Sequence, residues 1–96
     1  MKVEFADERL ALIRTREAHK LGLPIGVINS CRDKLHAIEQ ASSELTLRNL
    51  RSLNYKRLEG SDLRQIRLND QYRMRFKLDN TTTPPTVTVV FIGDPH

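Results

Sequence analysis

The sequence predicts an α+β fold, in which two N-terminal helices pack on one face of a small, mainly antiparallel β-sheet. Two patterns support this prediction. Apolar residues recur at helical spacing in the first half of the chain, and they alternate with polar residues at strand spacing in the second half. At 96 residues the chain is expected to form one domain, residues 1–96.

The first half supplies a short strand and two helices. Residues 1–5 alternate apolar and charged side chains, as a strand does, and residues 6–20 then follow a helical pattern. Pro24 is suited to the first position of a second helix, which we expect to end near Ala41. One face of this second helix carries apolar residues at spacings of 3, 4 and 7, namely Val27, Ile28, Cys31, Leu35 and Ile38.

The second half supplies a hairpin and a last strand. Residues 45–58 mix leucines with basic residues in no regular period, so we expect an irregular connection that contains a short extended piece. After a turn at residues 60–62, strands over 63–68 and 72–78 are joined by a three-residue polar loop typical of a hairpin. The last strand covers residues 86–92, and the prolines before it predict an exposed loop.

The charge is distributed unevenly along the chain. Residues 1–45 hold seven basic and seven acidic side chains, whereas residues 48–77 hold nine basic residues, seven of them arginine, against three acidic ones. Because arginine binds phosphate through two parallel hydrogen bonds, this excess indicates a polyanionic partner. A solvated basic surface that only maintains solubility is the alternative.

Several classes of protein do not fit the composition. The single Cys31 excludes an intramolecular disulfide and any multi-cysteine metal site, and we expect no cofactor. No apolar run approaches the roughly 20 residues of a membrane span, and the N-terminus has acidic residues where a signal peptide has its apolar core. We therefore expect a cytoplasmic protein that does not bind a membrane.

The stretch IRLNDQYRMRF alternates arginines with apolar residues on both sides of a polar break. Because neighbours in a strand point to opposite faces, Met74 and Phe76 belong to the core. The same rule places Arg73 and Arg75 on the uncovered face, and Arg67 joins them across the hairpin. Directly opposed like charges cost up to ~1 kcal/mol, so a phosphate chain on this face would remove a penalty. An ordinary solvated face is the alternative, and the alternation alone does not exclude it.

Two further places could carry chemistry. Asp94 and His96 follow the last strand, and a carboxylate with an imidazole can transfer protons near neutral pH, although a frayed terminus is the alternative. Tyr55 in NYKR could stack on nucleic-acid bases, whereas Tyr72 is assigned to the core. Neither His19 nor His36 has another metal ligand at a suitable spacing, so we expect no metal site.

Together these segments resemble the HigB branch of the RelE/ParE superfamily of bacterial toxins. The resemblance runs through GLPIGVINSCRDKLHAIEQA, LRSLNYKRLEG and QIRLNDQYRMRF, and it closes on GDPH. The most specific part is IRLNDQYRMRF, which is similar to the family pattern I-R-x-N-D-Q-x-R-x-x-F. The resemblance implies a RelE-like fold and a toxin that cuts mRNA on the ribosome by metal-independent attack of the 2′-hydroxyl. It also implies a cognate antitoxin, typically a helix-turn-helix DNA-binding protein similar to HigA.

The resemblance further implies roles for particular residues. Arg73 matches the arginine after N-D-Q-x and would stabilise charge on the scissile phosphate, and Arg67 would hold the RNA backbone. Asp94 and His96 match the two ends of the family's D-Y-H, and either of them or Lys56 could carry protons. The expected catalytic residues are Arg73, Lys56, Asp94 and His96, and the expected RNA-binding residues are Arg57, Arg67, Arg75 and Tyr55.

Three positions depart from the family pattern. Pro95 stands at the tyrosine of D-Y-H, Lys56 stands where members often have a histidine, and Glu59 replaces the lysine of an x-L-K-G turn. Pro95 and Glu59 keep open a second hypothesis, a ParE-like toxin that inhibits a protein target by binding and cuts nothing. A third hypothesis is a nucleic-acid-binding module without catalysis or toxicity.

Overall fold

The computed structural model of the chain covers residues 1–96 and has five strands in the order β1-β5-β4-β3-β2. β1 runs parallel to β5, and every other pair of neighbours is antiparallel. The α+β class and the mainly antiparallel sheet are therefore confirmed. The elements are β1 (Lys2–Phe5), α1 (Glu8–Ala11), η1 (Leu12–Arg14), η2 (Ala18–Leu21), α2 (Ile25–Gln40), α3 (Glu44–Asn49), η3 (Arg51–Leu53), β2 (Lys56–Arg57), β3 (Leu63–Arg67), β4 (Arg73–Asp79) and β5 (Thr86–Gly93), where η marks a 3-10 helix.

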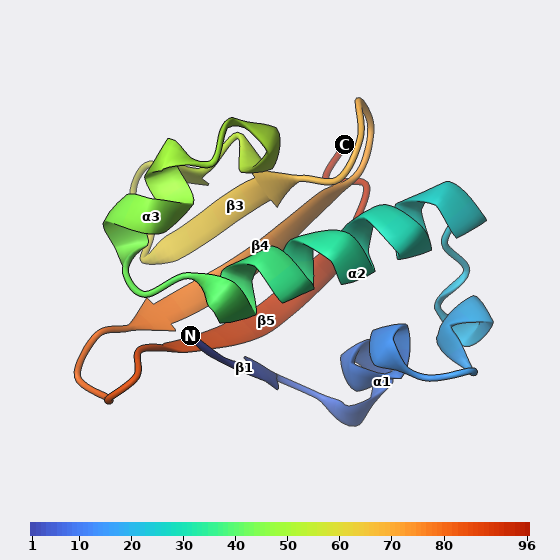
Figure 1. Ribbon diagram of the computed structural model, residues 1–96. Coiled ribbons are helices and arrows are strands. Elements are labelled where there is room, and N and C mark those ends of the chain that lie inside the picture. Colours follow the sequence, from blue (N-terminus) through green and yellow to red (C-terminus); the bar gives the residue numbers. More distant parts are fainter.

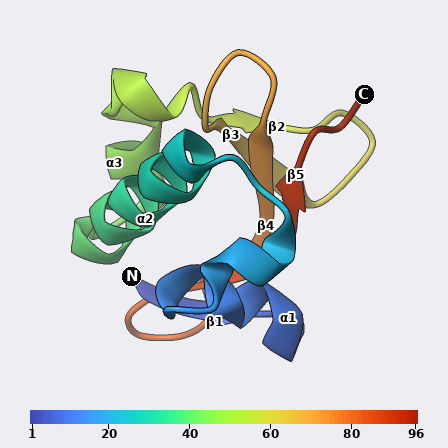
Figure 2. The ribbon, with the colours of Figure 1, turned by 90° about the vertical axis from the view of Figure 1, so that its right-hand side faces the viewer.

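The helices α2 and α3 cover one face of the sheet (Figure 1). In the view of Figure 2, they lie on one side of the strands, and the β2–β3 turn and the C-terminal segment lie on the other side. One cluster of buried apolar residues fills the space between helices and sheet, with Ile66, Met74, Phe76, Val87 and Val89 contributed by the strands. The opposite face of the sheet is not covered by a helix, and we call it the open face. No helix is long and apolar enough to cross a membrane.

The helix α2 has the predicted extent and the predicted buried face. It begins after Pro24, whose carbonyl oxygen accepts hydrogen bonds from the backbone N–H groups of Val27 and Ile28, both at 3.0 Å. Its buried side chains are the five predicted from the spacing of apolar residues. The amino group of Met1 donates to the carbonyls of Glu39 and Ala41, each at 2.8 Å, and so supplies a positive charge where the helix dipole favours one.

The helix predicted over residues 6–20 is wrong in its extent. Only α1 is α-helical, and η1 and η2 follow it as separate 3-10 helices. Thr15 stops the helix because its hydroxyl donates to the carbonyl of Leu12 at 2.9 Å and accepts from the backbone N–H of Glu17 at 3.1 Å. These local hydrogen bonds compete with the helical ladder, as threonine side chains often do.

The irregular connection predicted over residues 45–58 is wrong in its first part, where α3 forms. Ser43 caps this helix, since its hydroxyl accepts from the backbone N–H of Thr46 at 3.3 Å, and Glu44 lies in the first turn, where a negative charge suits the helix dipole. Leu47 is the residue that α3 buries in the core. The short extended piece expected in this region is β2, at the edge of the sheet.

The tip of the predicted β3–β4 hairpin is attached to α2. The hydroxyl of Ser30 donates to the carbonyl of Leu68 at 2.7 Å, and Nζ of Lys34 donates to the carbonyl of Arg67 at 2.6 Å. Partial burial, together with the nearby charge of Arg67, lowers the pKa of Lys34. The helix therefore fixes the position of the loop that joins the two arginine-bearing strands.

Candidate nucleic-acid interface

Basic side chains gather on the open face of β2, β3 and β4. Because Ile66 and Met74 are buried against the helices and pair with each other, their neighbours Arg67 and Arg73 point to the opposite face and are also direct partners. One step further along the strands, Gln65 pairs with Arg75, and Lys56 of β2 pairs with Gln65. The predicted placement of the hairpin arginines is confirmed. We define the cationic patch as Lys56, Arg67, Arg73, Arg75 and Lys77.

The cationic patch has few acidic partners. Arg67 forms an ion pair with the exposed Asp70, and no other member of the patch has a carboxylate within ion-pair distance. Arg67 and Arg73 face each other directly, an arrangement that costs up to ~1 kcal/mol in an empty sheet. A bound polyanion would offset this repulsion.

The N-D-Q loop holds Arg73 in place. Oδ1 of Asn69 accepts hydrogen bonds from the backbone N–H groups of Gln71 at 2.8 Å and Tyr72 at 2.7 Å, which closes the turn. Nη1 of Arg73 then donates to the carbonyl of Tyr72 at 2.9 Å and to the carbonyl of Asn69. The Nε and Nη2 groups of Arg73 donate to no protein atom, so one edge of the guanidinium remains available for a ligand.

The same loop ties down the C-terminal segment. Gly93 pairs with Arg73 at the end of β5, and Nε2 of Gln71 donates to Oδ2 of Asp94 at 2.8 Å. The other carboxylate oxygen accepts from the backbone N–H of His96 at 2.9 Å and lies 3.0 Å from its Nδ1. Asp94 and His96 thus lie directly after Gly93, the partner of Arg73, and Gln71 holds them to the N-D-Q loop.

These hydrogen bonds determine the ionisation of Asp94. The hydrogen bond from Gln71, followed by those from His96, lowers the pKa of Asp94 to about 2. An ionised carboxylate can only accept, so Nδ1 of His96 carries the proton in the hydrogen bond that joins the two side chains. Nε2 of His96 is then free to accept a proton when the ring is neutral and to donate one when it is charged.

Arg75 lies between two side chains of the open face. Its Nε donates to Oε1 of Gln65 at 3.0 Å, and its guanidinium carbon lies 5.4 Å from the centre of the Phe91 ring. Gln65 is 7% exposed even though no helix covers it. Sequence reasoning identified neither Phe91 nor the hydrogen bond of Gln71 to Asp94, because both depend on how β4 pairs with β5.

The structure does not bring Tyr55 to the cationic patch. Its ring packs on the helix side of the sheet, 6.1 Å from the ring of Phe76, and its hydroxyl donates to Glu44. Burial, together with the hydrogen bond to Glu44, raises the pKa of Tyr55 to about 12. Arg64 donates to the same carboxylate at 3.3 Å, so Tyr55 belongs to a cluster that joins α3 to the sheet.

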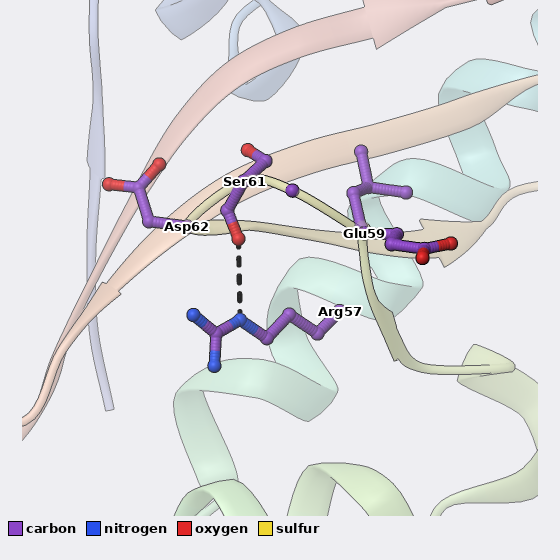
Figure 3. Close-up of a pocket in the computed structure, with 6 residues that line it drawn as sticks. Arg57, Glu59, Ser61 and Asp62 are labelled. Carbon is purple, nitrogen blue, oxygen red and sulfur yellow. Dashed lines mark hydrogen bonds between the residues drawn. The ribbon is translucent and has the colours of Figure 1, made fainter.

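Arg57 also lies apart from the patch. It pairs with Arg64, which faces the helices, and its Nε donates to the carbonyl of Ser61 at 3.3 Å across the β2–β3 turn (Figure 3). A hollow of about 620 Å³ opens inside this turn. The turn is possible because Gly60 adopts a φ of 73°, and its other charged residues are Glu59 and Asp62. The hollow therefore belongs to one short segment and lacks the excess of positive charge that marks the patch.

The remaining chemical groups do not form a metal site. No three His, Cys, Asp or Glu side chains lie close enough together to hold a metal ion. Cys31 lies on the buried face of α2, and this burial raises the pKa of its thiol to about 12, so it is a core residue rather than a nucleophile. The chemistry that the open face can supply is phosphate binding by arginine and proton transfer by the Asp94–His96 pair.

Comparison with known proteins yields one structural likeness. No family model matches the sequence, and no curated protein sequence matches it. Among solved structures, the YoeB/ParE toxin from Agrobacterium tumefaciens is similar to the chain with a TM-score of 0.60 and 12% sequence identity, over 100% of both chains. At this identity the likeness shows the fold, and it confirms the RelE-like fold that the sequence predicts. The chain therefore has, over its whole length, a fold similar to that of a YoeB/ParE toxin.

Proposed function

We propose that the chain is the toxin of a type II toxin–antitoxin system and that it cleaves mRNA on the ribosome. The observation that carries this proposal is the juxtaposition of Arg73 and Arg75, which have no carboxylate partner, with the hydrogen-bonded pair Asp94 and His96. The fold, which is similar to that of a YoeB/ParE toxin, supports the toxin class. The stretch IRLNDQYRMRF, which resembles the HigB pattern, supports the choice of a nuclease within that class.

The proposed reaction needs only groups that the open face contains. The 2′-hydroxyl of the RNA loses its proton to a base and attacks the adjacent phosphorus. The bond from phosphorus to the 5′-oxygen then breaks, and that oxygen takes up a proton from an acid. The products are a 2′,3′-cyclic phosphate and a free 5′-hydroxyl. The protein must orient the chain, neutralise the extra charge on the phosphate and move two protons.

Arg73 is suited to the charged phosphate. Its Nη1 is occupied by the carbonyl groups of the loop, which fixes the guanidinium, and its Nε and Nη2 edge can bind two phosphate oxygens at once. Arg67, directly opposite, would hold a neighbouring phosphate after releasing Asp70. An exposed ion pair of this kind contributes at most about 1 kcal/mol, so its release is easily offset.

His96 or Lys56 would move the protons. Nε2 of His96 can act as base or acid because Asp94 holds the other ring nitrogen. Lys56 is exposed and lies at the opposite edge of the patch, on β2. The His96→Ala and Lys56→Ala variants distinguish which of the two groups transfers the protons.

The shape of the site supports the proposed dependence on the ribosome. The patch lies on an open sheet surface, and the two hollows of the molecule are lined by the β2–β3 turn and by residues near the opposite end of the sheet. A surface of this kind orients a flexible chain poorly, so the ribosome would present the RNA in the geometry that the reaction requires. Free RNA is then expected to be a poor substrate.

The cognate antitoxin would be a helix-turn-helix DNA-binding protein similar to HigA. Two surfaces offer contacts: the cationic patch to acidic residues, and the exposed Ile25 and Leu45 on α2 and α3 to apolar ones. The affinity of purified toxin for purified antitoxin, measured at increasing salt concentration, shows which surface is used. Binding through the patch should weaken because salt screens its charges, whereas binding through the apolar residues should not.

Mapping the 5′ ends of cellular transcripts after a pulse of expression tests the proposed function. Expression of the wild-type chain should produce new ends within translated regions, and expression of the Arg73→Ala variant should not. Unchanged transcripts in cells whose growth has nevertheless stopped would contradict the nuclease proposal.

The ParE-like alternative is favoured by two departures from the family pattern, Pro95 in place of the tyrosine and Glu59 in place of a lysine. A proline can neither stack on a base as an aromatic ring does nor share a proton. If the chain inhibits a protein target only by binding, the Arg73→Ala variant and the deletion of His96 should leave toxicity intact. The nuclease proposal expects large losses of toxicity from both changes.

A further inference from the structure

Phe91 is an aromatic ring on the side of the sheet that carries the cationic patch. The alternation along β5 buries Val87 and Val89 against the helices and would bury residue 91 as well. The register of β4 against β5 shifts between Arg75 and Phe76, so Phe76 pairs with Val89 whereas Arg75 pairs with Phe91. The extra residue of this β-bulge turns Phe91 to the open face. Bulges re-aim side chains in this way, often beside functional sites.

The ring of Phe91 is held from two sides. Arg75 lies over it at 5.4 Å from the ring centre, and Arg75 is itself fixed by the buried Gln65 through a hydrogen bond of 3.0 Å. On the other side, the Cζ atom of Phe91 lies 3.1 Å from the position that a Cβ atom of residue 93 would occupy. Gly93 thus leaves the room in which the ring rests, and Gly93 is the direct partner of Arg73.

We propose that Phe91 and Arg75 form a stacking site for a nucleobase next to the scissile phosphate, an inference that rests on the proposed function. The ring is partly exposed, the guanidinium beside it has no carboxylate partner, and both lie in the row of the patch next to Arg73. Any of the four nucleobases can stack on an aromatic ring or on the plane of an arginine guanidinium. A base on this site would align the ribose and its 2′-hydroxyl with the phosphate that Arg73 binds.

A second arginine–phenylalanine pair in the molecule shows the contrasting case. The guanidinium of Arg14 lies 5.8 Å from the centre of the Phe5 ring. Arg14 forms two hydrogen bonds with Glu39, at 2.7 and 3.2 Å, and Phe5 packs against the core. That pair is neutralised and belongs to the folded scaffold, so the Phe5→Leu variant is a matched control for the Phe91→Leu variant.

The test is a single-turnover cleavage assay with bacterial ribosomes that carry a model mRNA. In a series of mRNAs, one nucleotide at a time near the cut is made abasic, so that the sugar and the phosphate remain. For the wild-type chain we expect one abasic position to slow cleavage about 10-fold, within the range of a lost base–aromatic stack. The Phe91→Leu variant should cut intact mRNA about 10-fold more slowly and show no further loss at that position. Cleavage by the Phe91→Tyr and Phe5→Leu variants should stay close to that by the wild type.

The possible outcomes separate this inference from the proposed function. If the Phe91→Leu variant is as sensitive to the abasic position as the wild type, or if the wild type tolerates abasic nucleotides everywhere, the stacking site is refuted and the nuclease stands. If the wild type cuts no mRNA on ribosomes, both proposals fail. A Phe91→Leu variant that is slow only because it is partly unfolded would still show the abasic penalty and a lowered melting temperature, which also counts against the stacking site.

Discussion

The two faces of the sheet treat their arginines in opposite ways. On the helix side, Arg64 is 13% exposed in its side chain and shares the carboxylate of Glu44 with Arg48 and the hydroxyl of Tyr55. On the open face, Arg73 and Arg75 donate to uncharged groups only, and their positive charge has no carboxylate partner. The same residue type thus holds elements together on one face and remains available on the other.

This difference distinguishes charges that stabilise the fold from charges that are candidates for binding a partner. Charges that fold a protein are paired, because a half-buried cation without a partner costs free energy. On the open face, Arg73 and Arg75 have no carboxylate partner, and Arg73 lies directly opposite Arg67 in spite of their repulsion, as we expect of charges that bind a polyanion. Substitutions on the two faces should therefore have different effects. Those on the open face should lower activity, and those on the helix side should lower stability.

The largest effect is expected from Arg73→Ala. It removes the group that would neutralise the phosphate in the transition state, and the loss of one such donor lowers rates by about 10²–10³-fold. Cleavage of ribosome-bound mRNA should fall by this factor, while the melting temperature changes little. The Arg16→Ala variant is the control, because Arg16 is exposed between η1 and η2 and its loss changes the net charge equally. Equal losses of activity in both variants would show that only the net charge matters.

The second effect is expected from His96→Ala. Removing a general acid or base lowers a rate by about 10²-fold or more, so the cleavage rate should fall by at least this factor at pH 7. If the Lys56→Ala variant loses as much activity and the His96→Ala variant none, the proton-transfer role belongs to Lys56.

The third effect concerns stability and the helix side. The hydrogen bond from Tyr55, with the contribution of Arg64, lowers the pKa of Glu44 below its usual 4.5, so its charge stabilises the fold above that pH. The Glu44→Gln variant should lose about 1–2 kcal/mol of unfolding free energy at pH 7 and keep its cleavage rate. The difference in stability should shrink as the pH falls below 4.5 and vanish below the lowered pKa of Glu44. Denaturant unfolding at several pH values measures this, and a pH-independent difference would contradict it.

The smallest effect is expected from Asp70→Asn. Asp70 is almost fully exposed and is the one acidic partner of the patch, through Arg67. Because exposed ion pairs contribute little, unfolding free energy should change by less than about 0.5 kcal/mol. Freeing Arg67 should strengthen binding to ribosome-bound mRNA by about twofold, a change measurable from the dependence of the cleavage rate on toxin concentration. Weaker binding would mean that Asp70 orients Arg67 for the RNA.

The sequence alone predicted the elements whose signals are local. The helix α2 follows from its apolar spacing after Pro24, and the β3–β4 hairpin with its arginine-bearing open face follows from alternation around N-D-Q. The errors have local causes as well. The hydroxyl of Thr15 interrupts the first helix, and the six residues of α3 are too few to show a period.

The candidate site was predicted in part for the same reason. Arg67, Arg73 and Arg75 lie where the alternation predicts, but Tyr55 faces the helix side because Glu44, on a helix that the sequence did not reveal, binds its hydroxyl. Phe91 was not predicted, since a β-bulge depends on the pairing of two strands, and the break in the alternation of β5 at Val90 does not by itself show to which face Phe91 turns.

We propose that the open face cleaves RNA by directing the 2′-hydroxyl at the neighbouring phosphate. The most direct measurement is the chemical nature of the ends that the purified chain creates on ribosome-bound mRNA, read by mass spectrometry of the two fragments. We expect a 2′,3′-cyclic phosphate on the upstream fragment and a 5′-hydroxyl on the downstream fragment, both absent with the Arg73→Ala variant. A 3′-hydroxyl with a 5′-phosphate, or intact mRNA, would contradict it.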